Sequence, residues 1–194
     1  MSMQDVYDWI DANADECVRD LQRFVQQPSI SAQNVGLREC AALVREMMHE
    51  DGLPAEFHEL EEGPPVVFGH LEARKPSKTI LCYSHYDVQP PEPLDEWTHG
   101  GPWSGEIVDG VMYGRGSTDN KSGVLAFNKA AKAFLQVRGE VPVSLKFLIE
   151  GEEEIGSPNL AAWAEKNEEL LKACLLYTSP SPRDRTRSRM PSSA

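Results

Sequence analysis

Residues 79–90 read TILCYSHYDVQP, a short apolar run that passes directly into a cluster of polar residues. The apolar part, TILCYS, has the length and composition of a buried strand. The same junction recurs downstream, where VPVSLKFLIE (141–150) passes into EGEEEIGS (150–157). Between the two runs, the loop GRGSTDNKSG (114–123) leads into a helical pattern from Ser122 to about Val137. Strand, helix and strand in this order predict an α/β domain with parallel strands at its centre.

Further helices are predicted on both sides of this unit. Apolar residues recur at helical spacing from residue 6 to residue 25, and Pro28 ends that helix. A second helical pattern covers 37–50. Near the other end, Ser157 and Pro158 predict the N-cap and the first position of a helix that continues to Leu171.

The remaining strand signals lie before and after TILCYS. AEFHEL (55–60) alternates as a strand does, and VVFGHLEA (66–73) is a second strand candidate. Asp109-Gly110 stands between two β-favouring runs, which is the strongest short signal for a hairpin.

Composition excludes several classes of function. Of the 194 residues, 40% are hydrophobic and 26% charged, as in soluble globular proteins. No apolar run is long enough to span a membrane, and the acidic N-terminus does not have the pattern of a signal peptide. The four cysteines form no C-x-x-C pair, which favours a reducing cytoplasm. A net charge of −12 argues against nucleic acid bound through a basic face.

From about Leu175 the composition changes to LLYTSPSPRDRTRSRMPSSA, rich in Ser, Pro and Arg. Such a stretch is typical of a disordered arm. It also resembles the peptide that results when sequencing-adapter DNA is translated at the end of a truncated read. We therefore expect a domain over 1–174 and a non-native, disordered tail over 175–194.

The polar clusters are the candidate functional residues, because ligands of open α/β sheets bind outside the carboxyl ends of the strands. His85 has Asp87 two residues further on, where a carboxylate can orient a metal-binding imidazole. Asp119 lies before a helix, where it is either an ordinary helix-start acid or a ligand. Lys121-Ser122 has the ending of a phosphate loop, but Asn120 stands where that loop has Gly.

The acidic cluster at 150–154 is either a solvated run of charge or a cation site. Its position after an apolar strand favours the second interpretation, because closely packed carboxylates stay ionised together around a divalent cation. Histidine and carboxylate ligands suit zinc, with manganese or cobalt as alternatives. No G-x-S-x-G occurs, which argues against the usual serine-hydrolase elbow.

SHYDVQP, YGRGSTDNKSG and EGEEEIGS, in this order, resemble the co-catalytic zinc peptidase family of carnosine and Cys-Gly dipeptidases, aminoacylase, carboxypeptidase G and succinyl-diaminopimelate desuccinylase. The resemblance covers most of 1–174 and looks closest to the dipeptidase branch. It implies a three-layer α/β sandwich with a mostly parallel central sheet. It also implies two divalent metals, most simply zinc, and a homodimeric full-length parent.

Carried over by residue, the resemblance implies metal ligands at His85, Asp119 and Glu154, with Asp119 bridging both ions. Glu153 would be the general base, and Asp87 would support His85. The family also implies a further Asp ligand, a late His ligand and an inserted domain. The nearest Asp after Glu154, Asp184, lies in the Arg-rich tail. We therefore expect an N-terminal fragment with little or no activity of its own.

Three functions remain open. The first is hydrolysis of short peptides through a metal-bridging water. The second is an amidohydrolase that acts on N-acyl amino acids with the same metals and base. The third, from a different class, is a non-catalytic α/β binding module with an acidic surface.

Overall fold

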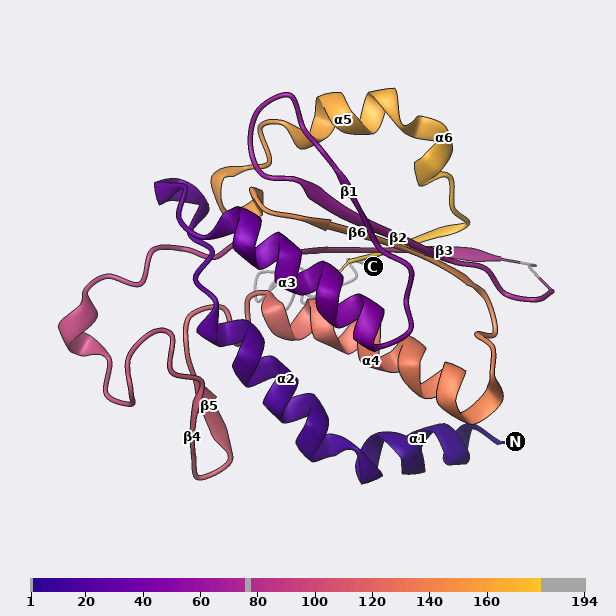
Figure 1. Ribbon diagram of the computed structural model, residues 1–194, viewed down its shortest axis with the longest axis horizontal. Helices are drawn as coiled ribbons and strands as arrows, with labels where there is room; N and C mark the ends of the chain where they lie inside the picture. The colour runs from indigo at the N-terminus through magenta and orange to yellow at the C-terminus, as the bar shows by residue number, and fades with distance from the viewer. Residues whose placement is uncertain (1, 76–77, 179–194) are drawn as a thin grey trace, which may run out of the picture.

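The computed structural model describes residues 2–75 and 78–178, and a five-stranded sheet lies at its centre (Figure 1). The strand order is β1-β2-β6-β3-β7, and β2 alone runs opposite to the other four strands. This confirms the mostly parallel sheet that the sequence predicts. The bounds are β1 (Glu56–His58), β2 (Val66–Leu71), β3 (Thr79–His85), β6 (Ser144–Glu150) and β7 (Leu175–Thr178).

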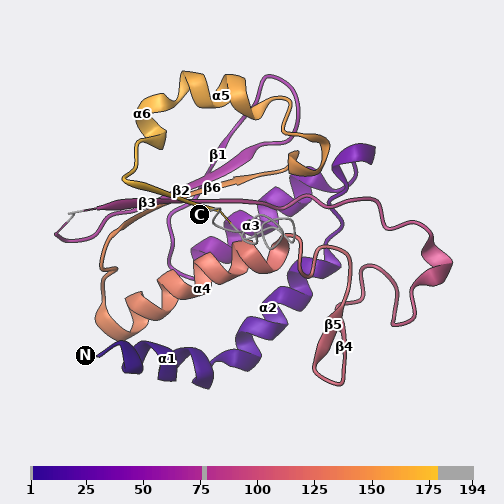
Figure 2. The ribbon, with the colours of Figure 1, turned by 180° about the vertical axis from the view of Figure 1, so that it is seen from behind.

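Helices cover both faces of the sheet, so the molecule has three layers (Figures 1 and 2). One face carries α3 and α4, with α1 and α2 beyond them, and the opposite face carries α5 and α6. The helices are α1 (Met3–Ala12), α2 (Ala14–Gln26), α3 (Leu37–Glu50), α4 (Lys121–Arg138), α5 (Leu160–Lys166) and α6 (Glu168–Leu171). The predicted helix over 37–50 is confirmed, and α4 contains the predicted 122–137.

The central strands are buried on both faces because their side chains alternate between two apolar clusters. In β6, Phe147 and Ile149 join the cluster under α3 and α4, whereas Leu148 joins the cluster under α5 around Trp163. In β3, Cys82 faces the first cluster and Leu81 the second. A strand that is apolar on both sides reads as a continuous apolar run, which is why TILCYS and VPVSLKFLIE stand out in the sequence.

Two predicted helices are wrong in detail. The predicted single helix over 6–25 is two helices, because the side-chain amide of Asn13 donates to the backbone oxygen of Trp9 and ends α1 there. The single helix expected from Pro158 to Leu171, with Ser157 as its N-cap, is two helices, and the first of them begins at Leu160 with Asn159 as its N-cap residue. Ser157 cannot cap the helix, because its hydroxyl donates to the carboxylate of Glu150 instead.

The predicted hairpin is confirmed. It consists of β4 (Glu106–Val108) and β5 (Val111–Tyr113), paired antiparallel and set apart from the main sheet (Figure 1). Both turn residues, Asp109 and Gly110, have positive φ angles of 51° and 79°. That is the conformation that favours Asp-Gly in a two-residue turn.

The segment expected to be a tail contributes to the sheet at its start. Leu175–Thr178 forms β7 and pairs parallel with β3. The boundary expected after residue 174 therefore does not coincide with the end of regular structure. Residues 179–194, including Asp184, lie outside the described residues.

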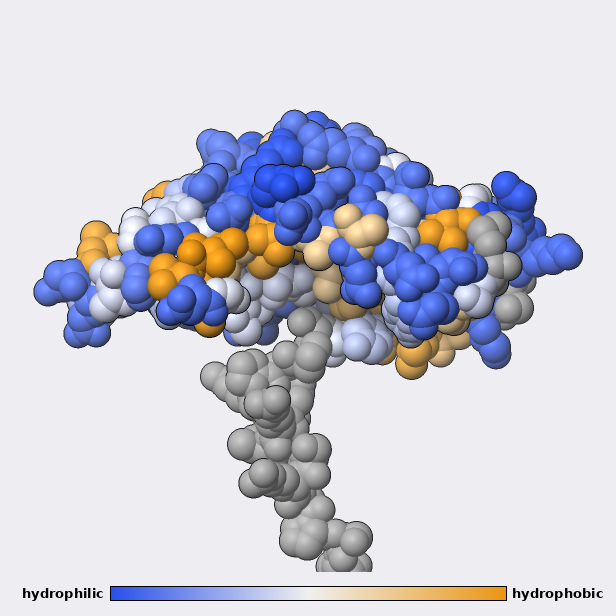
Figure 3. Space-filling view, turned by 90° about the horizontal axis from the view of Figure 1, so that it is seen from below, coloured by the Kyte–Doolittle hydropathy of each residue, from blue (hydrophilic) through white to orange (hydrophobic). Residues whose placement is uncertain are grey.

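The surface in Figure 3 is mostly hydrophilic, and its apolar residues lie in separate patches. Among the described residues, no helix is long and apolar enough to cross a membrane.

Candidate metal centre

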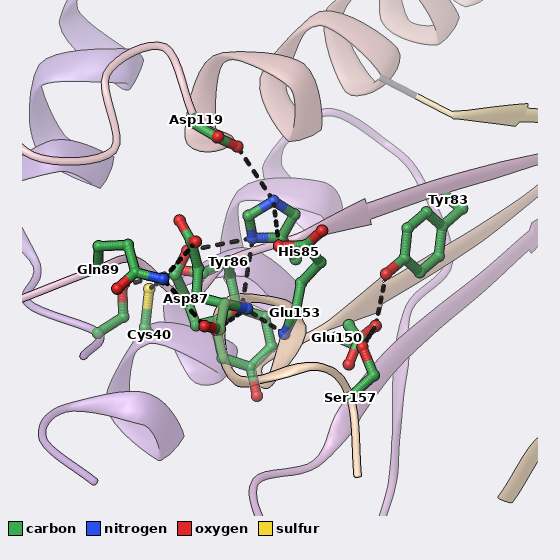
Figure 4. Close-up of polar contacts among 12 residues, drawn as sticks. Cys40, Tyr83, His85, Tyr86, Asp87, Gln89, Asp119, Glu150, Glu153 and Ser157 are labelled. Atoms are coloured by element: carbon green, nitrogen blue, oxygen red, sulfur yellow. Dashed lines mark hydrogen bonds and ion pairs between the residues drawn. The ribbon is translucent and has the colours of Figure 1, made fainter. Parts of the chain in front are cut away.

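The end of β3 places alternate residues on opposite sides of an extended segment (Figure 4). Tyr86 and Val88 have no exposed surface. The Tyr86 hydroxyl donates to the backbone oxygen of Pro65 at 2.8 Å. His85, Asp87 and Gln89 point the other way and meet the loop after β6. The sequence H-x-D-x-Q thus gathers three polar side chains at one edge of the sheet.

His85 lies at the centre of this group, and its side chain is 4% exposed. Its Nδ1 is 3.2 Å from Oδ1 of Asp87. Its Nε2 is 3.2 Å from Oδ1 of Asp119 and 3.8 Å from Oε2 of Glu153. The structure therefore brings together four of the five residues that the sequence singles out, from three separate segments of the chain.

The charges around His85 change its protonation. Burial disfavours the charged ring, but the hydrogen bonds to Asp119 and Asp87 and the charges of Asp87 and Glu153 outweigh it. Together they raise the pKa of His85 to about 10. A metal ion on Nε2 must therefore displace a proton.

Asp119 reaches His85 from the loop before α4, and its side chain is 58% exposed. The loop is anchored by Lys121, which is fully buried. The Lys121 ammonium donates to the backbone oxygens of Phe24 and Gln27 at 2.9 and 2.5 Å, at the end of α2. Burial lowers the pKa of Lys121. The carbonyls at the end of α2 oppose this effect, because the last carbonyls of a helix carry partial negative charge.

Glu153 and Glu154 lie in the 3₁₀ turn η3 (Glu153–Ile155), directly after β6. Asp87 accepts the backbone N–H of Glu153 at 3.2 Å and that of Glu154 at 3.0 Å. The Glu153 carboxylate is 45% exposed and faces His85. The Glu154 carboxylate instead accepts a bond from the amide of Gln89 at 2.8 Å. Burial is the main cause that raises the pKa of Glu154, and the charge of Asp119 adds to it.

Two other members of the acidic cluster have structural partners. Glu150 is buried and accepts bonds from the Tyr83 hydroxyl at 2.5 Å and the Ser157 hydroxyl at 2.7 Å. Burial raises the pKa of this carboxyl. Glu152 accepts both of its bonds from the amide of Asn159, at 3.0 and 3.1 Å. These contacts close the loop 150–159 and leave Glu153 and Glu154 as its members at the centre.

The donor atoms around His85 fit a divalent cation. At metal–ligand distances of about 2.0–2.2 Å and a tetrahedral angle, two ligand atoms of one zinc ion stand roughly 3.3 Å apart. Nε2 of His85 and Oδ1 of Asp119 are 3.2 Å apart. Within residues 2–75 and 78–178, no three His, Cys, Asp or Glu side chains converge as a ready-made site. The pair therefore fits a cation, and a third ligand has to turn toward it.

Three of the other four histidines make contacts away from this site, and His70 lies in β2 opposite Lys146. His49 bonds the backbone oxygen of Ala55, His58 bonds Glu56, and the ring of His99 lies against Tyr113. The residue that sequence reasoning missed is Gln89. The alternation of H-x-D-x-Q after an apolar strand is the signal that could have found it.

Comparison with known proteins gives one family. Residues 81–188 match the model of Peptidase family M20/M25/M40. The chain is 34% identical over 182 residues to the Beta-Ala-His dipeptidase of Homo sapiens, covering 86% of this chain and 36% of that protein. It is 34% identical over 174 residues to the Cys-Gly metallodipeptidase dug1 of Schizosaccharomyces pombe, covering 82% and 36%. It is 33% identical over 166 residues to the succinyl-diaminopimelate desuccinylase of Methylorubrum populi, covering 82% of this chain and 42% of that protein.

Solved structures of similar proteins share the fold of this chain. The crystal structure of human carnosine dipeptidase 1 superposes with a TM-score of 0.85 at 32% identity, covering 93% of this chain and 41% of that one. The M20 family metallo-carboxypeptidase Sso-CP2 from Sulfolobus solfataricus gives a TM-score of 0.80 at 37% identity, covering 87% and 38%. The chain thus spans about a third to two fifths of the length of these relatives.

Proposed function

The chain belongs to peptidase family M20/M25/M40, and we propose that it carries part of the metal centre of a hydrolase that cleaves short peptides. The observation that carries this proposal is the His85–Asp119 pair, whose 3.2 Å spacing suits two ligands of one cation. We assign His85, Asp119 and Glu154 as ligands, with Asp119 shared between two ions. The metals are zinc, with manganese or cobalt as alternatives. A bound divalent cation would acidify a water molecule and polarise the scissile carbonyl.

Two residues of the chain supply proton transfer and positioning. Glu153 is the base, because its carboxylate is 45% exposed to solvent and its Oε2 lies 3.8 Å from Nε2 of His85, beside the proposed ligands. It can accept a proton from water and pass it to the leaving amine. Asp87 holds His85 through Nδ1 and thereby directs Nε2 toward the cation. Asp87 also fixes the backbone of Glu153, so ligand and base share one anchor.

The substrate class follows from the relatives. The two dipeptidases are named for β-Ala-His and Cys-Gly, so dipeptides are the first substrates to test. The alternative, an amidohydrolase on N-acyl amino acids, is supported by the similarity to the desuccinylase.

Metal uptake by the 194-residue chain tests the proposal. The protein is stripped with a chelator and titrated with Zn²⁺ or Co²⁺ in a calorimeter. We expect the wild-type chain to bind the metal. His85→Asn and Asp119→Asn should each weaken binding by at least roughly 10–100-fold, the loss that follows removal of a residue that only supports a ligand. His49→Asn is the matched control, because His49 is exposed and bonds only Ala55 among its recorded contacts. No uptake, or uptake that both site variants leave intact, would contradict the metal centre and favour a non-catalytic binding module.

Hydrolysis separates the two catalytic alternatives. The metal-loaded chain is offered β-Ala-His, Cys-Gly and N-succinyl-diaminopimelate. We expect weak turnover, because the described residues place a single histidine at the site. Any turnover should disappear in Glu153→Gln, which keeps the metal but removes the base. Turnover of the succinyl substrate alone would favour the amidohydrolase.

A further inference from the structure

Gln89 makes two hydrogen bonds to one residue of the site. Its side-chain nitrogen donates to the backbone oxygen of Glu154 at 2.9 Å and to Oε2 of the Glu154 carboxylate at 2.8 Å. Figure 4 shows Gln89 beside Asp87 on the segment that follows β3.

Asp87 and Gln89 act on Glu154 from neighbouring places on the same segment. Asp87 accepts the backbone N–H of Glu154 at 3.0 Å. Gln89 donates to its backbone oxygen and to one carboxylate oxygen. The backbone of Glu154 is therefore held at both its donor and its acceptor, and its side chain is held at Oε2. This leaves Oε1 as the oxygen available to a cation.

We propose that Gln89 is a positioning residue that holds Glu154 so that one of its oxygens serves as a metal ligand. The inference rests on the proposed function, because it takes Glu154 as a ligand. A carboxylate that binds a metal commonly keeps its other oxygen in a hydrogen bond, which fixes its orientation. An amide suits this task, because it donates without adding charge. A lysine at this position would add a positive charge that repels the cation, and a glutamate would repel Glu154.

The opposite role makes the opposite prediction. If Gln89 instead kept Glu154 away from the cation, removal of its amide would free the ligand and strengthen metal binding. The sign of the change in affinity therefore decides between the two roles.

The test is Gln89→Met, which keeps the length of the side chain and removes the amide. Gln89 is exposed, so the variant is expected to fold with little change in stability. The apo chain is titrated with Co²⁺, and affinity is measured by calorimetry. Ligand geometry is followed by the visible absorption of the bound ion. We expect affinity to fall roughly 10–100-fold and the absorption bands to shift. Gln26→Met is the matched control, because Gln26 is an exposed glutamine that donates to the backbone oxygen of Ser104.

A double-mutant cycle shows whether Gln89 acts through Glu154. In a Glu154→Ala background, Gln89→Met should cause no further loss of affinity, because the side chain it orients is gone. An equal loss in both backgrounds would overturn the inference. Unchanged or stronger binding in Gln89→Met alone would also overturn it. In either case, wild-type binding that depends on His85 and Asp119 would leave the proposed metal centre standing. Only the absence of binding by the wild type would remove both.

Discussion

Oδ2 of Asp87 lies 3.0 Å from the backbone nitrogen of Glu154, and through this bond the end of β3 holds the turn after β6. The Asp87 side chain has no exposed surface, and its other oxygen accepts the backbone N–H of Glu153 at 3.2 Å. Asp87 keeps these hydrogen bonds only when the end of β3 and the turn after β6 lie next to each other. Asp87 therefore links the position of His85, the proposed ligand, to the position of Glu153, the proposed base.

Asp87→Asn should lower both stability and metal affinity. An amide oxygen can replace one acceptor, but the amide nitrogen would face a backbone N–H that it cannot accept. A buried donor left without a partner costs about 1–3 kcal/mol. We expect the free energy of unfolding in urea to fall by that amount. Loss of the charge beside His85 should also weaken Zn²⁺ binding roughly 10–100-fold.

The matched control is Asp109→Asn in the β4–β5 turn. Asp109 has a φ angle of 51°, a conformation that Asn adopts as readily, and Asn-Gly suits the same turn. This variant should behave as the wild type in both measurements. An Asp87→Asn protein with normal metal affinity would show that Asp87 has only a structural role.

Asp51 should be important for stability but not for the metal site. Its side chain is 1% exposed, and Oδ1 lies 2.6 Å from the Lys129 ammonium and 2.9 Å from that of Lys132. Removing one partner of a buried ion pair costs about 3–5 kcal/mol. We expect the stability lost in Asp51→Ala to be at the lower end of this range, because Lys129 keeps Asp20 and Lys132 keeps Glu16 as a second partner. Urea denaturation should show a lower midpoint with an unchanged slope.

Glu59→Ala provides the comparison for Asp51. It breaks an ion pair with Arg38 in which both side chains are more than half exposed. Exposed ion pairs contribute little to stability, because water screens the charges. A loss in Asp51→Ala no larger than in Glu59→Ala would show that the buried cluster does not stabilise the fold. Zn²⁺ affinity should stay at the wild-type value in both variants.

Thiol labelling should separate the four cysteines by burial. Cys174 is exposed, whereas Cys40 and Cys82 are buried. Burial raises the pKa of Cys40, and it raises the pKa of Cys82 to about 11. A higher pKa leaves less thiolate, so at pH 8 only about one Cys82 in a thousand is reactive even before access is considered. With a disulfide reagent at pH 8, we expect Cys174 to react first.

Two measurements complete the labelling experiment. All four thiols should react at similar rates in denaturant, and Cys174→Ser should remove the fast phase from the native protein. Cys17 is half buried and burial raises its pKa, so it should follow Cys174 more slowly. Fast labelling of Cys40 or Cys82 in the native protein would contradict the packing of α3 and β3 described above.

Much of the fold can be predicted from local pattern. The apolar runs that become β3 and β6 are recognisable because both faces of each strand are covered, so no polar alternation interrupts them. The Asp-Gly turn predicts its hairpin because few residues tolerate positive φ angles. The residues that meet around His85 can also be anticipated, because polar clusters after parallel strands lie at one edge of the sheet. The roles assigned to them remain proposals.

Other features depend on which partner a side chain finds. Ser157 has the sequence position of a helix cap, yet its hydroxyl bonds Glu150. Asn13 ends a helix that apolar spacing alone would continue. The four residues of β7 belong to a stretch whose composition predicts disorder, yet they pair with β3. In each case the local sequence pattern is compatible with two structures, and a contact with another part of the chain determines which of them forms.

By itself, the sequence determined most of the strands and helices, the apolar faces of these elements, and the polar residues that stand at strand ends. These are properties of neighbouring residues, because the periods of 2 and 3.6 are set by backbone geometry. Only the tertiary structure decided that β2 runs opposite to its neighbours, that Asp119 meets His85, and that Gln89 donates hydrogen bonds to Glu154. Those relationships join residues far apart in the chain, and they form only when burial of both faces of the sheet brings its loops together.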